Sequence, residues 1–410
     1  MTKDSLLLRG GAVLDMAAGE LRAADVLVEG DRIAAVGPGL APPAGARVAN
    51  ISGGTIMPGL IDCHVHVCAD GMVAYPTLFP SLVAARAARL LHETLLRGFT
   101  TIRDMGGADA GFRRAVEEGL FPGPRMFVSG RPLSQTGGHG DKRNPADACP
   151  ACALRAEATM GIVADGVDAV RRAAREEIRR GVDQIKIMAS GGISSPADPV
   201  DYDQYALDEI TAAVDEATRA HRYVAAHAYT PTAIARAVAC GVRTIEHGNF
   251  LDEDSARRMA EAGAFLVPTL VVYRRVVQHA AEVGISAFHL AKAKEVLATG
   301  TRSLEIARRA GVKMALGTDL FRAPKQYQAE ELLIRAEALP AAEVLRSATV
   351  TGAEVIRMAD RLGQVKEGFL ADLLVVDGDP LSDLSVLQDQ GARFPMILKG
   401  GVAAKDSLAA

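Results

Sequence analysis

Eight short apolar runs alternate with longer stretches at helical spacing through the middle of this 410-residue chain. The alternation favours an α/β fold in which each strand is followed by a helix. Eight such units in roughly 250–300 residues predict a (β/α)8 TIM-like barrel. The alternative is a doubly wound open sheet, which normally carries a glycine-rich fingerprint after its first strand, and GLIDCH at 59–64 is not one. The runs are 59–63, 100–103, 125–129, 184–189, 223–226, 244–246, 265–269 and 313–317, and the clearest amphipathic stretches are 169–180, 206–221, 232–240 and 303–310.

The two ends of the chain differ from this middle because they contain short strand-like runs with Gly and Asp turns. We expect both ends to build one small β-sandwich domain, from residues 1–57 and 357–410, beside a barrel at 58–356. A long polar insertion at 141–166 is predicted to be a loop at the barrel mouth. The predicted strands of the small domain are 5–8, 12–14, 25–29, 32–36, 372–377 and 395–399.

Composition narrows the possible partners. The formal net charge of −4, without a basic surplus, argues against nucleic-acid binding, and no run of 18 apolar residues suggests a membrane span. The apolar run at 6–8 is too short for a signal peptide, and five scattered cysteines indicate reduced thiols, so we expect a cytoplasmic protein. Cys149 and Cys152 have metal-ligand spacing, but a structural zinc site needs four ligands and no second pair is present. Two free thiols in a loop are the favoured interpretation.

Histidine is rare, yet five of the nine histidines fall at or just past the ends of predicted strands. In a barrel, strand ends at this face converge on one site. Two of them form a His-x-His pair, and residues i and i+2 of an extended segment point the same way, so both imidazoles can reach one metal ion. The five are His64, His66, His139, His227 and His247.

Asp319 and Lys186 extend this set. Asp319 follows the eighth run, next to the first strand of a closed barrel, where it could complete the ligands of one ion and handle a proton. Lys186 lies inside an apolar run, and a bare ammonium beside cations would be repelled. Carbamylation by CO2 would convert it into an anion able to bridge two cations. Taken singly, each residue fits a purely structural role better, but their conjunction on the first, fourth, fifth, sixth and eighth runs indicates a two-metal site.

At these residues the chain resembles the amidohydrolase superfamily. Within it the chain is similar to the branch of Xaa-Pro and Xaa-Arg dipeptidases, imidazolonepropionase-like enzymes and ochratoxin-hydrolysing amidohydrolases. The resemblance covers nearly the whole length, and no ligand is missing. It is carried by MPGLIDCHVH at 57–66, GFTTIRD at 98–104, TGGHGD at 136–141, VADG at 163–166, IKIMASGG at 185–192, HAYT at 227–230, IEHG at 245–248, GTD at 317–319 and GFLADLLVVD at 368–377.

The resemblance implies specific roles. His64, His66 and Asp319 would hold the more buried metal, and His227 and His247 the second. Carbamylated Lys186 and a hydroxide would bridge the two ions. The expected ions are Zn²⁺, which suits such nitrogen and oxygen ligands.

The reaction implied is hydrolysis by the metal-bound hydroxide, with Asp319 taking its proton and passing it to the leaving amine. His139 and Tyr229 would support the carbonyl oxygen or a substrate carboxylate. Relatives of this branch also imply a homo-oligomer, in some cases an octamer.

Three functions remain open from sequence. The leading one is hydrolysis of a peptide-like amide, in a dipeptide or an N-acyl amino acid, with ochratoxin A among the candidates. The second is ring opening of a cyclic amide or imidazolone. The third is a metal-binding protein without catalysis, against which Asp319 argues because a storage site needs no base. Arg236 could pair with a substrate carboxylate, although an exposed helical role is favoured, and His289 could line the pocket or lie on a helix.

Overall fold

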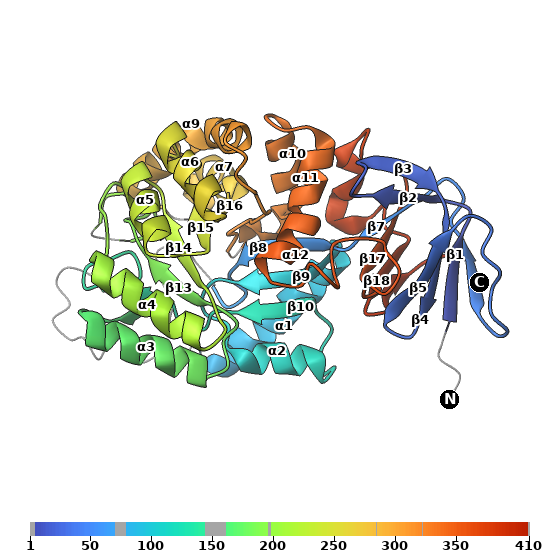
Figure 1. Ribbon diagram of the computed structural model, residues 1–410, viewed down its shortest axis with the longest axis horizontal. Helices are drawn as coiled ribbons and strands as arrows, with labels where there is room; N and C mark the ends of the chain where they lie inside the picture. The colour runs from blue at the N-terminus through green and yellow to red at the C-terminus, as the bar shows by residue number, and fades with distance from the viewer. Residues whose placement is uncertain are drawn as a thin grey trace.

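The computed structural model places two parts side by side, a smaller lobe of strands and a larger lobe of strands and helices (Figure 1). The smaller lobe contains strands from both ends of the sequence, and the larger lobe is formed by the middle of the chain. The structure describes residues 5–69, 79–143, 161–195, 198–283, 285–321 and 323–408.

Two sheets make up the smaller lobe. In one of them β17 pairs antiparallel with β7, which joins the C-terminal strands to the N-terminal ones. Apolar side chains from both sheets, among them Leu8, Val26, Ile56 and Val375, form a single buried cluster. The first sheet has the order β5 (Arg32–Gly37), β4 (Asp25–Glu29), β1 (Ser5–Arg9) and β6 (Arg47–Asn50). The second has the order β19 (Val402–Asp406), β18 (Met396–Lys399), β17 (Leu373–Val376), β7 (Thr55–Pro58), β2 (Ala12–Asp15) and β3 (Glu20–Ala23).

The strands of the larger lobe are all parallel, in two hydrogen-bonded groups. Seven of the eight predicted runs are strands within a residue or two of the expected bounds. The insertion predicted to be a loop contributes β12, which pairs with β11. One group is β8 (Leu60–Val65), β9 (Phe99–Asp104) and β10 (Arg125–Val128). The other is β12 (Ile162–Val163), β11 (Leu133–Ser134), β13 (Ile185–Met188), β14 (Val224–Ala228), β15 (Thr244–His247) and β16 (Phe265–Val267).

The eighth run, predicted as a strand at 313–317, is wrong as a regular strand. Only an isolated bridge joins Met314 to Leu266 of β16. The segment still links its neighbours, because Leu266 N donates to Lys313 O and Cys63 N of β8 donates to Leu316 O. The N–H of Leu316 donates to Ser347 O instead of to β8, so the hydrogen-bond ladder between this segment and β8 does not continue.

Helices cover the outer face of these strands, and α3 and α4 lie beside each other outside β13 (Figure 1). Ile185 and Ile187 pack among apolar helix residues, so the alternate residues of β13 point inward. Of the helices in the described ranges, none has the length and apolarity needed to cross a bilayer. The α-helices are α1 (Pro80–Leu96), α2 (Ala110–Glu117), α3 (Val167–Arg179), α4 (Leu207–Arg219), α5 (Pro231–Ala239), α6 (Glu253–Ala262), α7 (Leu270–Gln278), α8 (Ala280–Val283), α9 (Ala287–Arg309), α10 (Glu330–Ala336), α11 (Ala341–Ser347) and α12 (Val350–Val355). The 3-10 helices are η1 (Ala323–Tyr327), η2 (Leu384–Leu387) and η3 (Asp389–Gly391).

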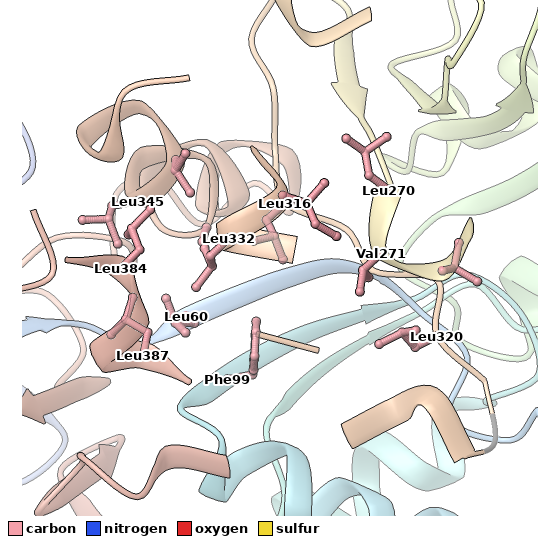
Figure 2. Close-up of a cluster of buried hydrophobic side chains, with 14 of the residues drawn as sticks. Leu60, Phe99, Leu270, Val271, Leu316, Leu320, Leu332, Leu345, Leu384 and Leu387 are labelled. Atoms are coloured by element: carbon pink, nitrogen blue, oxygen red, sulfur yellow. The ribbon is translucent and has the colours of Figure 1, made fainter. Parts of the chain in front are cut away.

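A large apolar cluster packs between the parallel strands and the C-terminal helices, and Figure 2 draws part of it. Leu60 and Phe99, at the starts of β8 and β9, belong to this cluster together with Leu332 of α10, Leu345 of α11 and Leu387 of η2. The cluster therefore ties the amino ends of β8 and β9 to the C-terminal segment.

Candidate active site

Polar side chains meet in a pocket at the carboxyl ends of the parallel strands. Every residue that the sequence predicted for catalysis or metal binding lines this pocket. These residues come from six separate segments of the chain, so the fold alone brings them together. They are His64, His66, His139, Lys186, His227, Tyr229, His247 and Asp319.

His64, His66 and Asp319 form the tightest group, with one potential ligand atom from each lying within 4.8 Å of the others. Asp319 Oδ1 lies 3.1 Å from His66 Nε2 and 3.6 Å from His64 Nε2. The two histidines share a side because Ile61 and Cys63 of β8 face a separate apolar cluster. The backbone N–H of Asp319 donates to His64 O at 2.8 Å, which fixes the carboxylate beside the pair.

His227 and His247 lie against this group. The ring centroid of His247 is 4.9 Å from that of His64 and 4.6 Å from that of His227. Burial lowers the pKa of His64, His227 and His247 well below the usual value, so their rings are neutral near pH 7. Neutral imidazole is the form that binds a metal. The donor set of buried neutral rings and a carboxylate therefore fits a borderline divalent cation.

Lys186 lies 2% exposed in β13, with its side chain in the same pocket. Burial lowers the pKa of its amine to about 8. Burial therefore increases the fraction of this lysine that is in the unprotonated, nucleophilic form near neutral pH. Only that form can react with CO2.

Hydrogen bonds on the far side of the rings orient the histidines. His64 Nδ1 lies 2.8 Å from Glu246 Oε2, and His66 Nδ1 lies 2.9 Å from Gly106 O. Because a carboxylate and a carbonyl only accept, both Nδ1 atoms carry a proton, and the Nε2 atoms, which both face Asp319, are the candidate metal-binding atoms. For His227 the roles of the two nitrogens are reversed, because Nε2 lies 3.0 Å from Gly191 O and so carries the proton, which makes Nδ1 the candidate metal-binding atom.

His139 and Tyr229 occupy the rim of the ring cluster. His139 stacks on His227 with centroids 4.2 Å apart, and its Nδ1 lies 2.8 Å from Ser195 Oγ. Tyr229 O–H lies 2.8 Å from the hydroxyl of Tyr273. Both residues present polar groups next to the candidate ligands, as an electrophilic role requires.

Several residues of the site were not predicted from the sequence. Tyr273 and Lys142 line the pocket, and Glu246 with Arg103 forms a fully buried ion pair behind His64. Helix α7 carries Tyr273 within an apolar stretch, and nothing in its spacing marks it as a site residue.

Of the three features on which the sequence was less decisive, the two that the structure describes, Arg236 and His289, do not line the pocket. Arg236 pairs with Asp203 at 3.3 Å and donates to Tyr205 O. His289 lies on α9 and contacts Ser195 O at 3.2 Å. The predicted thiol loop with Cys149 and Cys152 lies outside the described residues.

Comparison with known proteins gives a consistent result. The model of the amidohydrolase family matches residues 55–402. Ochratoxinase from Aspergillus niger is 33% identical over 375 residues, covering 84% of this chain and 75% of that protein. Crystal structures of an amidohydrolase and of a prolidase complexed with N-methylphosphonate-L-proline are both 48% identical, with TM-scores of 0.96 and 0.95. They match 99% and 98% of this chain, respectively, and the whole of each solved chain.

Proposed function

The chain belongs to the amidohydrolase family and is a hydrolase acting on C–N bonds, and on this premise we propose that it cleaves a peptide-like amide with the help of two divalent metal ions. The observation that carries the proposal is the group of His64, His66 and Asp319 with two further neutral imidazoles against it. Six candidate ligands are more than one tetrahedral ion can use.

We assign the ligands as follows. His64, His66 and Asp319 would hold one ion, His227 and His247 would hold the other, and Lys186, as a carbamate, would supply a ligand to both. The amine nitrogen of Lys186 forms a bond to the carbon of CO2 and loses a proton, which leaves one negative charge on the new group. Zn²⁺ is the proposed ion because nitrogen and carboxylate ligands suit it.

When bound, the ions lower the pKa of water and polarise the scissile carbonyl. Asp319 is placed to accept the proton of the attacking water and to return it to the leaving amine. Tyr229 O–H and a ring nitrogen of His139 serve as donors to the carbonyl oxygen, in a buried setting where such bonds are strong.

The proposed substrate is a dipeptide or an N-acyl amino acid, with ochratoxin A as one candidate. The names of the similar proteins, prolidase and ochratoxinase, support this class. Both names refer to enzymes, which disfavours a metal-binding protein without catalysis.

We also propose that the parallel strands close into a (β/α)8 barrel spanning 58–356, with 1–57 and 357–410 as the accessory domain. Hydrogen bonds across the two gaps support closure: segment 313–317 bonds to β16 and β8, and Asp183 N donates to Val128 O at 2.8 Å. A cytoplasmic homo-oligomer remains the proposed state.

Amino-acid release from a dipeptide library tests the function. The zinc-loaded protein is expected to liberate amino acids from a subset of dipeptides, and removal of zinc by a chelator should abolish the activity. Ring opening of cyclic amides without release of an amine from any dipeptide or N-acyl amino acid would contradict the proposal.

A further inference from the structure

A second lysine, Lys142, lines the pocket in addition to Lys186. Its Nζ makes one hydrogen bond within the described part of the chain, to Ser194 Oγ at 2.9 Å, and no ion pair there. Ser194 Oγ also lies 3.4 Å from His139 Nε2. The ammonium is therefore held beside a proposed electrophilic residue and has only a neutral partner.

Three carboxylates act electrostatically on Lys142, but none of them forms an ion pair with it among the described residues. Asp141 binds the guanidinium of Arg143, Asp198 accepts from Gly192 N and Gln204 Nε2, and Asp319 lies against the two histidines of β8. Burial lowers the pKa of Lys142 to about 8, because its cation is poorly solvated. A desolvated cation without a counter-ion gains most from an anionic ligand.

The segment that carries Ser194 is braced from α9. Lys292 Nζ donates to Asp198 O at 3.0 Å and also to the carbonyls of Gly192 and Ser195. His289 Nε2 contacts the same carbonyl of Ser195. Lys292 differs from Lys142 because three backbone acceptors satisfy its ammonium. Ser194 thus holds the side chain of Lys142 in position, and the ammonium of Lys142 can still bind a ligand in the pocket.

We propose that Lys142 binds the free carboxylate of the substrate's leaving amino acid and so determines the preference for substrates with that group. This inference rests on the proposed function and adds to it the residue that binds the free carboxylate of the substrate. Arg236, the cation considered from the sequence, is engaged by Asp203 and Tyr205 and does not line the pocket.

Equilibrium binding tests the assignment without depending on turnover. The probes are N-methylphosphonate-L-proline, the ligand in the similar prolidase structure, and its C-terminal carboxamide. Binding of both to the zinc-loaded protein is measured for wild type, Lys142→Met, Lys142→Arg and the control Lys313→Met. Lys313 suits the control because its side chain is 62% exposed and pairs with Glu354 at the surface. Zinc content and thermal unfolding are measured for each variant.

Wild type should bind the acid ~10- to ~150-fold more tightly than the carboxamide, the range for a hydrogen bond between charged groups. Lys142→Met should lose the preference for the acid, while its affinity for the carboxamide stays within about threefold of the wild-type value. Lys142→Arg should keep most of the preference for the acid, and Lys313→Met should keep all of it. The wild-type ratio tests the idea even if Lys142→Met does not fold. Equal affinity of wild type for both probes, no binding of either, or equal losses for both in Lys142→Met would overturn it. If the preference holds but no dipeptide is cleaved, the proposed function fails and the role of Lys142 stands.

Discussion

Glu246→Gln tests whether the buried ion pair behind His64 positions a metal ligand. Glu246 and Arg103 are both 0% exposed, and Arg103 Nη2 lies 2.9 Å from each carboxylate oxygen. The carboxylate also accepts the Nδ1 proton of His64 and the hydroxyl proton of Thr244. Glutamine fills the same space but presents one NH2 group, and in either orientation that group faces a donor of Arg103 or His64.

Two losses follow from this geometry. The guanidinium of Arg103 becomes a buried charge without a counter-ion, which costs ~3–5 kcal/mol of folding free energy. Where the NH2 group faces His64, the ring must shift its proton to Nε2, the atom next to Asp319. The ring can then no longer offer that lone pair, so zinc affinity should fall ~10- to ~100-fold, as when other outer partners of ligating histidines are lost.

Denaturant unfolding of the metal-free protein and chelator competition for zinc measure the two losses separately. Glu331→Gln is the matched control, because Glu331 and Arg335 also form an ion pair with both side chains 0% exposed, and Glu331 contacts none of the proposed ligands. Measurements at pH 8 keep Glu331 ionised, above the pKa of about 7 to which burial raises it. Both variants should lose stability, and only Glu246→Gln should lose zinc affinity. Equal zinc affinity in the two variants would refute the positioning role.

Three further variants probe the remaining residues of the site. Lys186→Ala should lose bound metal and most activity, with partial rescue by short carboxylic acids, and full zinc content in this variant would argue against a bridging carbamate. His139→Ala should keep its zinc and lower kcat/KM by ~10²-fold or more, the scale for one preorganised donor; zinc loss with an intact fold would make it a ligand instead. Asp319→Asn should retain the metal at His227 and His247 and lower kcat by ~10²- to 10⁴-fold, the range of general acid–base catalysis; turnover within a few-fold of wild type would place the base elsewhere.

Much of this architecture could be predicted from the periodicity of apolar residues and from the position of polar residues at the ends of the predicted strands. The alternation within β8 placed His64 and His66 on one side, and the alternation within β13 separated Lys186 from the outward-facing isoleucines. Strand ends of parallel strands converge, so residues far apart in the sequence could be grouped before the structure was known.

Other features depend on the local backbone conformation, which the alternation of apolar and polar residues in the sequence does not predict. Ile245 faces the helices, so strict alternation would turn His247 the same way, yet His247 lines the pocket. Its backbone is left-handed, with φ of 72°, and Asp319 has φ of 52°. Non-glycine residues rarely adopt this conformation, and where they do it often marks a functional site. The run at 313–317 failed as a strand for a tertiary reason, the hydrogen bond from Leu316 N to Ser347 O.

We propose that six side chains hold two metal ions, with Lys186 carbamylated between them. A crystal structure of the zinc-loaded protein, with anomalous data collected on both sides of the zinc edge, tests this arrangement. We expect two zinc peaks per chain, one at His64, His66 and Asp319 and one at His227 and His247, with density for a carbamate on Lys186. A single zinc peak per chain, or two fully occupied peaks beside an unmodified lysine, would contradict it.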